Sequence, residues 1–366
     1  MNTFIIILFI FVIYMILHNF VFIYYIKLLH FFKKTDATKT DRPISKITII
    51  IPAYNEEQTI AKKIENIKQC CADITLPYEV LIGSDGSTDN TCKVTSRILK
   101  ENKLNNWKLF KFDNKGKCQT INRLVNHSNG DIIITTDADI NLLHDAFQII
   151  ITTFNSDSSV GCISSIPNYQ SGIMVSQSLY WCYEHKIRDV ESSAGLLIVS
   201  TGWLYAFTKN NFKEIPEGVM ADDLWIPLST LMQNFKSIHK KELKAKSEIT
   251  DEKTEINRRR RVISGGIDTV KRLFPFIIKK PLLFFIVFSH KINRWLLPLW
   301  IFLLVCLSML INTYFIVFYL GLLIVIAFLL KPKGLYSILY SIITPLLSLK
   351  RNLTSTDLSK WEHTRK

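Results

Sequence analysis

The sequence of 366 residues has no internal repeat, no low-complexity tract and no recognisable RNA-binding motif. Its seven cysteines are odd in number and do not have the spacing of metal ligands. Reduced thiols in a cytosolic compartment are therefore their simplest explanation. The net charge of +14 is concentrated beside apolar segments, a pattern that fits an anionic membrane surface. We expect no disulfide framework and no nucleic acid among the partners.

The N-terminus lacks both a basic leader and a small-residue cleavage site. Residues 4–26 are nevertheless apolar over a length that can cross a bilayer, so we expect an uncleaved anchor. Basic residues follow this run and none precedes it, so we expect the N-terminus outside and the main domain in the cytosol. His18 and Asn19 interrupt the run, and we expect them to pack against another span.

The middle of the chain alternates short apolar runs with helix-like ones. The sequence predicts strands at residues 47–51, 78–82, 107–112 and 131–136, and helices at residues 56–71, 88–100 and 117–126. Strand and helix in alternation predict a parallel α/β sheet with right-handed crossovers.

The strand predicted at residues 131–136 ends abruptly in Asp137-Ala138-Asp139. Residues two apart on an extended chain point the same way, so the two carboxylates face one side about 7 Å apart. Such hard oxygen ligands, at the C-terminal end of a parallel strand, suit a divalent cation that carries a diphosphate. Taken alone, a D-x-D is more often a solvated acidic turn, so this interpretation depends on the neighbouring motifs.

The other predicted strands also end in polar clusters, which are IPAYNEE (51–57), GSDGSTDN (83–90) and NKGK (114–117). The first places acids at a helix start. In the second, small residues let the backbone approach a ligand, and Asp85 can accept hydrogen bonds from a base or ribose. The third puts ammonium groups at a helix N-terminus, a natural phosphate site. Each cluster alone fits ordinary turn chemistry, but together they predict one crevice.

In this order and spacing, IPAYNEE, SDGSTDNT, NKGK and TTDAD resemble the motifs of family 2 glycosyltransferases. The resemblance implies an α/β, GT-A (Rossmann-like) nucleotide-sugar-binding domain with N- and C-terminal transmembrane helices. It implies Mg²⁺ or Mn²⁺ as cofactor. It also implies a nucleotide diphosphate sugar as donor, with a UDP-sugar as the first candidate. Position by position, it assigns the nucleotide sugar to Pro52, Ala53, Tyr54, Glu56, Asp85, Lys117 and Asp137, and the metal to Asp139 and Asp137.

Two segments further along resemble the acceptor side of the same family. TGWLYAF (201–207) implies that Gly202 and Trp203 contact the acceptor, although a small residue is more usual at position 203. The indole there is either a stacking platform for a sugar or a bulky group that narrows the pocket. MADDL (220–224) aligns Asp223 with the family's base and leaves Asp222 as the fallback, although both also fit as acids favoured by a helix N-terminus. A carboxylate there can deprotonate a hydroxyl that attacks the anomeric carbon on the face opposite the diphosphate. A single in-line displacement without a covalent intermediate inverts the anomeric centre, so we expect inverting transfer.

Arginines are concentrated at residues 258–261, near the place where polymerising members of the family carry Q-x-x-R-W. Neither Gln nor Trp is in place, which counts against processive polymer synthesis. The resemblance implies that an arginine of this run, Arg258 or Arg261, approaches the diphosphate. The others are expected against lipid head groups.

The C-terminal third is predicted to associate with a membrane. We expect an interfacial helix at residues 274–288 and an interfacial hydrogen-bonding role for His290. A hairpin of two spans follows, and residues 335–349 form either a re-entrant helix or a further span. The predicted divisions are an N-terminal anchor (1–33), a linker (34–45), a GT-A domain (46–255), a basic interface region (256–294), a transmembrane hairpin (295–330) and a re-entrant or interfacial helix with a basic tail (331–366).

These features favour an inverting glycosyltransferase of the inner cell membrane with a cytosolic catalytic domain and a lipid-linked or cell-surface glycan as acceptor. A processive polysaccharide synthase and a polyprenyl-phosphate glycosyltransferase are the alternatives within this class. A nucleotidyltransferase would need a glycine-rich, arginine-containing first loop, and residues 52–57 contain neither glycine nor arginine. A non-catalytic membrane scaffold or transporter component would be marked by loss of the D-x-D or the base, and both are present.

Overall fold

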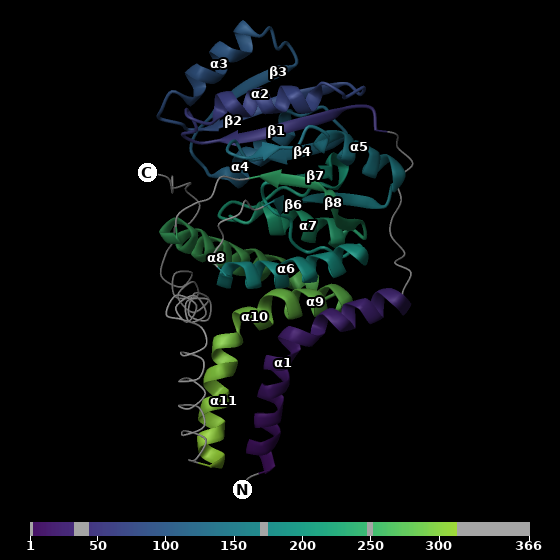
Figure 1. Cartoon of the computed structure of the whole chain (residues 1–366), viewed down its shortest axis with the longest axis vertical. Coiled ribbons are helices and arrows are strands. Elements are labelled where there is room, and N and C mark those ends of the chain that lie inside the picture. Colours follow the sequence, from purple (N-terminus) through teal and green to yellow (C-terminus); the bar gives the residue numbers. More distant parts are fainter. Residues whose placement is uncertain (1–2, 33–43, 169–174, 247–251, 313–366) are drawn as a thin grey trace.

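The computed structural model describes residues 3–32, 44–168, 175–246 and 252–312. An eight-stranded sheet lies at the centre of the described part, and two apolar helices extend away from it (Figure 1). The strands are β1 (Ile47–Ala53), β2 (Tyr78–Asp85), β3 (Trp107–Phe112), β4 (Ile132–Thr136), β5 (Asn141–Leu142), β6 (Val160–Asn168), β7 (Leu204–Thr208) and β8 (Lys236–Lys246). Their order is β3-β2-β1-β4-β7-β6-β8-β5.

The sheet has a parallel half and a mixed half. Strand β1 pairs in parallel with β2 and β4, and β2 pairs in parallel with β3, as the sequence predicted. Strand β7 then runs antiparallel to both β4 and β6, while β6 and β8 are parallel and β5 is antiparallel to β8. The prediction of a parallel sheet is therefore correct for the first four strands only.

Helices cover both faces of the sheet, and alternate strand residues point into two cores. Ile47, Ile49 and Ile51 face one core, whereas Ile50 faces the other, as the two-residue period of a strand requires. The helices of the main body are α2 (Ile60–Cys71), α3 (Thr91–Glu101), α4 (Lys117–His127), α5 (Ala146–Ser156), α6 (Val175–Ser193), α7 (Asp222–Met232) and α8 (Glu252–Ile277), with a 3₁₀ turn at Lys209–Asn211. Helices α2 and α5 pack in the first core, and α4 and α7 pack in the second.

Two predicted helix starts are wrong by three or four residues. Helix α2 begins at Ile60 and α3 at Thr91, whereas the sequence predicted starts at 56 and 88. Residues before both helices also make hydrogen bonds between the two loops. The structure thus leaves the polar residues of both motifs in loops at the strand ends.

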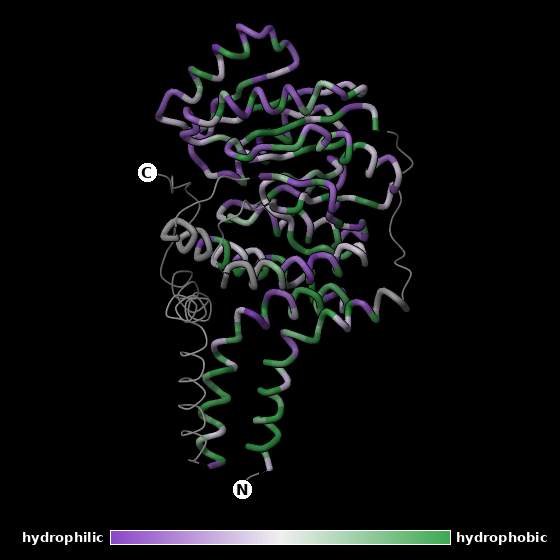
Figure 2. Tube along the Cα trace, viewed as in Figure 1, coloured by the Kyte–Doolittle hydropathy of each residue, from purple (hydrophilic) through white to green (hydrophobic). Residues whose placement is uncertain are grey.

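The remaining helices of the described chain are α1 (Thr3–Phe32), α9 (Pro281–Val287), a π turn (Phe288–Ile292), α10 (Asn293–Trp295) and α11 (Leu297–Ile311). Within the described ranges, one helix, α1, is both long enough and apolar enough to cross a membrane. The segments Pro281–Trp295 and Leu297–Ile311 meet that test only as a pair bent by 64°. Figure 2 shows the apolar character of α1 and α11, which extend from the same side of the sheet domain.

Of the two polar residues that interrupt the apolar run of α1, His18 packs against this second group of helices, whereas the Asn19 amide donates to the Met15 and Ile16 carbonyls of its own helix. The His18 ring Nε2 lies 2.8 Å from the Ser289 hydroxyl, and the Asn293 amide donates to the Met15 carbonyl at 2.9 Å. The second arm of the predicted hairpin and residues 335–349 lie outside the described residues. A C-terminal membrane span therefore stays a prediction.

Two expectations about residues 274–290 need correction. Residues 274–288 do not form one interfacial helix. Helix α8 continues through Pro275 and ends at Ile277, and a new helix, α9, starts at Pro281. His290 is fully buried instead of lying at an interface. Its ring nitrogens contact Glu191 at 2.6 Å and Glu184 at 3.1 Å, because α6 presents these two carboxylates on one face.

Candidate active site

The loops that follow β1 and β2 are joined by reciprocal hydrogen bonds. The Asn55 N–H donates to the Ser87 hydroxyl at 3.1 Å, and the Thr88 N–H donates to the Asn55 side-chain oxygen at 2.8 Å. Asn55 has a φ of +54°, a conformation that asparagine tolerates better than most residues. The two predicted nucleotide-binding motifs therefore form one unit, with Pro52 and Ala53 at the end of its first strand.

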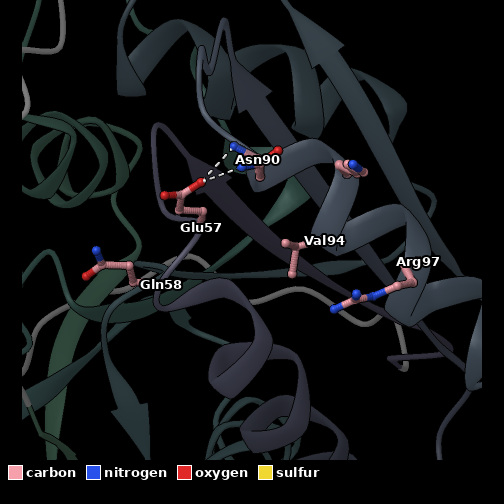
Figure 3. Close-up of a pocket in the computed structure, with 6 residues that line it drawn as sticks. Glu57, Gln58, Asn90, Val94 and Arg97 are labelled. Atoms are coloured by element: carbon pink, nitrogen blue, oxygen red, sulfur yellow. Dashed lines mark hydrogen bonds between the residues drawn. The ribbon is translucent and has the colours of Figure 1, made fainter.

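A second set of bonds closes the outer side of the same two loops. The Glu57 N–H donates to Asp89 at 3.1 Å, and the Glu57 carboxylate accepts from the Asn90 backbone at 3.0 Å and its side chain at 3.1 Å. Figure 3 shows Glu57 and Asn90 among the residues that line an open groove. The volume of this groove is about 490 Å³. The groove is lined by Glu57, Gln58, Asn90, Lys93, Val94 and Arg97. No residue of the D-x-D or of the Asp222–Asp223 pair lines this groove, which borders the outer side of the two loops.

The remaining residues assigned to the nucleotide lie close to this unit. Tyr54 and Glu56 are half-buried in the loop after β1, and the Glu56 N–H donates to the Thr91 hydroxyl at 2.7 Å. Asp85 ends β2 and is fully buried, and its carboxylate accepts from the Lys115 N–H at 2.9 Å and the Gly116 N–H at 2.8 Å. Asp85 therefore ties the NKGK loop to the loop after β2.

Lys117 connects the two halves of the site. It begins α4, and its ammonium lies 2.7 Å from the Asp137 carboxylate, 3.3 Å from the Asp222 carboxylate and 3.4 Å from the Gly202 carbonyl. Burial lowers the pKa of Lys117, but Asp137 and Asp222 outweigh it and raise the pKa above its usual range. The ammonium therefore stays charged at any working pH.

The D-x-D follows β4 directly, as predicted. Burial, with a further contribution from the charge of Asp139, raises the pKa of Asp137 to about 6 even though Lys117 opposes the shift. The Asp137 N–H donates to the Trp203 carbonyl at 3.3 Å. The turn that carries both acids is thus held against the segment that precedes β7.

Carboxylates from both halves of the site gather near Lys117. Asp137, Asp222 and Asp223 act on its ammonium, and Asp139 acts on Asp137. Lys63 also acts on Asp137 and Asp139. A diphosphate placed beside these carboxylates would be repelled by them, and a divalent cation bound between the two would offset that repulsion. Within the described ranges no three His, Cys, Asp or Glu side chains are grouped to hold a metal. The donor set therefore fits a divalent ion that takes one or two carboxylates from the protein and its other oxygens from a diphosphate and water.

Asp222 and Asp223, the two candidates for the general base, begin α7 and have different environments. Asp222 is almost fully buried and accepts a hydrogen bond of 2.6 Å from the Tyr205 hydroxyl, in addition to its contact with Lys117. Asp223 is half-buried, and burial together with the charge of Asp222 raises its pKa to about 6. Asp222 is thus held by two partners and almost fully buried, whereas Asp223 is only half-buried.

The predicted acceptor segment lies beside Asp223. Gly202 has a φ of +72°, and a Cβ built at this position would lie 3.6 Å from the Asp223 Oδ2 atom. The backbone of Asp223 is held as well, because its carbonyl accepts from the Ser200 N–H at 2.8 Å. Trp203 is half-buried and packs against the core that contains α2. Gly202 and Asp223 are therefore neighbours, as the prediction of one acceptor pocket requires.

The two arginines predicted at the diphosphate lie on α8. Arg261 is half-buried there. Their approach to a diphosphate stays a prediction, and so do the domain limits at 255 and 256, which fall within this continuous helix.

Sequence reasoning missed two residues of the site. Tyr205 is fully buried, and its hydroxyl donates to Asp222, a contact that no local pattern in the sequence indicates. Lys63 occupies the apolar face of α2, in the helical spacing of Ile60, Ile64 and Ile67, and is buried beside the D-x-D. A lysine at a core position of an amphipathic helix was the signal for the second residue.

Comparison with known proteins agrees with this geometry. The family model described as Glycosyl transferase family 2 matches residues 48–210. The chain contains a family 2 glycosyltransferase domain. The strand-end motifs, the D-x-D and the acceptor segment all fall inside the matched region of this domain, and Asp222 and Asp223 follow it.

Two curated relatives of the glycosyltransferase domain share a name, undecaprenyl-phosphate 4-deoxy-4-formamido-L-arabinose transferase. The protein from Yersinia enterocolitica is 34% identical over 97 residues, which are 26% of this chain and 30% of the relative. The protein from Serratia proteamaculans is 31% identical over 98 residues, which are 27% and 30% of the two chains. The aligned segments thus span less than a third of these relatives.

A solved structure resembles the fold over almost the whole chain. The mannosyltransferase PcManGT from Pyrobaculum calidifontis, in complex with GDP-Man and Mn²⁺, has a TM-score of 0.72 at 19% identity. The match covers 95% of this chain and 99% of that protein. The mixed α/β sheet of this glycosyltransferase domain is therefore GT-A-like.

Proposed function

We propose that this protein is a membrane-anchored, inverting glycosyltransferase. It moves a sugar from a nucleotide diphosphate sugar to a hydroxyl group of a lipid-linked or cell-surface glycan. The observation that carries the proposal is the Lys117 ammonium, which lies 2.7 Å from Asp137 of the D-x-D and 3.3 Å from Asp222 beside the proposed base. A donor diphosphate and an attacking hydroxyl would meet across this one residue.

The parallel half of the sheet is proposed to hold the donor. The fused loops after β1 and β2, together with Asp85, would bind the nucleotide, and Lys117 would contact the diphosphate. Asp137 and Asp139 would hold Mg²⁺ or Mn²⁺, and the ion, when bound, stabilises negative charge on the departing diphosphate. The complex of PcManGT with GDP-Man and Mn²⁺ supports this type of donor and metal.

Asp223 is proposed as the general base. Its pKa of about 6 leaves it ionised at neutral pH while keeping it more basic than an ordinary aspartate. It takes the proton of the acceptor hydroxyl as the oxygen attacks the anomeric carbon on the face opposite the diphosphate. A single displacement of this kind inverts the anomeric centre, in contrast to the two displacements of a retaining reaction.

Other residues of the acceptor half are proposed to orient the base and the acceptor. The Tyr205 hydroxyl and Lys117 hold Asp222, so Asp222 acts as a fixed negative charge that keeps the pKa of Asp223 raised. Gly202 leaves room for the acceptor next to Asp223, because any side chain there would contact the carboxylate. Trp203 would border the same pocket.

Transfer to a polyprenyl phosphate is the second candidate, since the names of the curated relatives contain that acceptor. A phosphate oxygen is already ionised at neutral pH and needs no base to attack. A half-buried carboxylate with a raised pKa therefore favours a hydroxyl acceptor. The predicted location is the inner cell membrane with the catalytic domain in the cytosol, and the long apolar helix α1 supports a membrane anchor.

The decisive experiment measures nucleoside diphosphate release by the detergent-purified protein. A panel of nucleotide sugars is supplied with Mg²⁺ or Mn²⁺, with and without a membrane-lipid extract. We expect metal-dependent release from one donor, and a rise when the extract is present. Asp139→Asn should abolish the release, whereas Asp145→Asn, which neutralises an exposed acid six residues away, should not. A wild-type protein that neither binds nor turns over any donor would overturn the proposal.

A further inference from the structure

A buried lysine lies directly behind the D-x-D. The ammonium of Lys63 donates to the Thr136 hydroxyl at 2.8 Å and to the Ile140 carbonyl at 2.7 Å. These two acceptors immediately flank the segment from Asp137 to Asp139. Lys63 is 2% exposed, so its ammonium is removed from water and its contacts are with the ends of this turn.

Lys63 is the first of three polar residues along one side of α2. Asn66 donates to the Leu142 carbonyl at 2.9 Å and accepts from the Leu142 N–H at 2.8 Å. The Cys70 thiol donates to the Leu143 carbonyl at 3.3 Å. Spacings of three and four residues place these side chains on one face of the helix. The chain that follows β4 is therefore attached to α2 at successive points, beginning at the D-x-D.

Helix α2 connects the nucleotide loop with the D-x-D turn. The helix starts at Ile60, immediately after the loop predicted to bind the nucleotide. Its N-terminal end is therefore fixed to the nucleotide loop and its side to the D-x-D turn. A shift of either segment relative to the other would strain the Lys63 contacts.

Packing alone does not account for a lysine at this position. The neighbouring positions of the face are isoleucines, and an apolar side chain would avoid the cost of burying an ammonium group. Burial lowers the pKa of Lys63 to about 7, and Asp137 and Asp139 oppose that shift. A polar, titratable amine is thus buried close to the two acids proposed to bind the metal.

We propose that Lys63 is a positioning residue that fixes the D-x-D turn so that both carboxylates face the metal and the diphosphate. It holds the hydroxyl of the residue before the turn and the carbonyl of the residue after it, and it does not contact the substrate. This inference rests on the proposed function, because it assumes that the D-x-D binds a metal together with a nucleoside diphosphate.

The test compares Lys63→Met with Lys62→Met, which removes an exposed lysine from the adjacent position of the same helix. Binding of Mn²⁺ is measured by electron paramagnetic resonance of the free ion, with the nucleoside diphosphate product present and no turnover. We expect Lys63→Met to weaken Mn²⁺ binding about 10- to 100-fold, as removal of a group that orients metal ligands usually does. Lys62→Met should bind as the wild type does.

Kinetics give a second readout that a merely structural role would not change. At limiting Mn²⁺ the Lys63→Met protein should show a raised KM for the donor, and saturating Mn²⁺ should restore most of its kcat. If Lys63→Met fails to fold, Thr136→Val removes one acceptor of the ammonium while keeping the shape of the side chain. That variant should also bind Mn²⁺ several-fold more weakly.

The outcomes separate this inference from the proposed function. Unchanged Mn²⁺ affinity in folded Lys63→Met, or in Thr136→Val if the former does not fold, would overturn the positioning role even if thermal stability falls. A wild-type protein that binds no Mn²⁺ with any nucleoside diphosphate would overturn the proposed function as well.

Discussion

The two halves of the sheet hold their polar residues by different means. In the parallel half, Asp85 is bound by two backbone N–H groups, and the loops after β1 and β2 are joined largely through backbone donors. In the mixed half, Asp222 is held by the side chains of Tyr205 and Lys117. The first arrangement gives a rigid cradle, and the second gives carboxylates whose charge depends on their neighbours.

This contrast predicts different consequences of mutation. Backbone donors survive most substitutions, so changes in the parallel half should mainly alter the affinity for the donor. The mixed half depends on a few buried charges, so a change there should mainly alter the chemical step. Lys117 belongs to both halves and should affect both quantities.

The largest expected effect is a loss of turnover without a loss of donor binding. Asp223→Asn should lower kcat by about 10²- to 10⁴-fold, because it removes the proposed general base. Binding of the nucleotide sugar, measured by isothermal titration calorimetry, should stay within about twofold of the wild type. Glu217→Gln, an exposed acid close to the start of α7, is the control and should leave both quantities unchanged. Retained turnover in Asp223→Asn would remove Asp223 from the mechanism.

The next largest effect should change both the chemical step and the affinity for the donor. Lys117→Met removes the ammonium that contacts Asp137 and Asp222 but keeps a side chain of similar length. We expect kcat to fall by about 10²- to 10³-fold, the usual effect of removing a group that stabilises developing charge. Donor affinity should fall as well. Lys115→Met tests the specificity of the effect, since this exposed lysine contributes its backbone N–H, and not its ammonium, to the site.

A smaller effect should appear as a pH dependence of kcat that originates in the mixed half alone. The pKa of Asp223 is raised to about 6, so the base is ionised above this pH and becomes protonated below it. The value of kcat should therefore be constant from pH 7 to 8 and fall about tenfold per unit below pH 6. Asp137 should not add to this fall, because a bound cation favours its charged form. Donor binding that fell in parallel with kcat would instead assign the titration to the D-x-D.

The same shift predicts a change in stability of opposite sign. A carboxyl whose pKa is higher in the folded state than in the unfolded state destabilises the fold as pH rises through this interval. The wild type should therefore lose stability between about pH 4 and pH 6 through this group. Asp223→Asn should not show this loss, so at pH 8 it should melt at the same temperature as the wild type or higher.

The parallel half was predictable from sequence, and the mixed half only in part. Strands β1, β2 and β4 contain short apolar runs, and β3 alternates apolar residues with lysine. All four end in polar motifs, so local pattern was sufficient to place Asp85, Lys117 and the D-x-D at one edge. Strands β5 to β8 were not predicted, because β8 reads as a run of lysines and β5 has two residues. The contact between Tyr205 and Asp222 joins residues 17 apart, and no local pattern encodes it.

The smallest expected effect tests whether the parallel half is as rigid as its backbone bonds suggest. Asn55 has a φ of +54°, and its side-chain oxygen accepts from the Thr88 N–H. Asn55→Gly removes this acceptor but tolerates the conformation, whereas Asn55→Ala also adds a strain of about 1 kcal/mol. We expect the KM of the donor to rise about two- to fivefold in the glycine variant and further in the alanine variant, with kcat unchanged in both. If kcat falls as far as the affinity does, the loop contributes to the chemical step, and the division of labour between the two halves would be wrong.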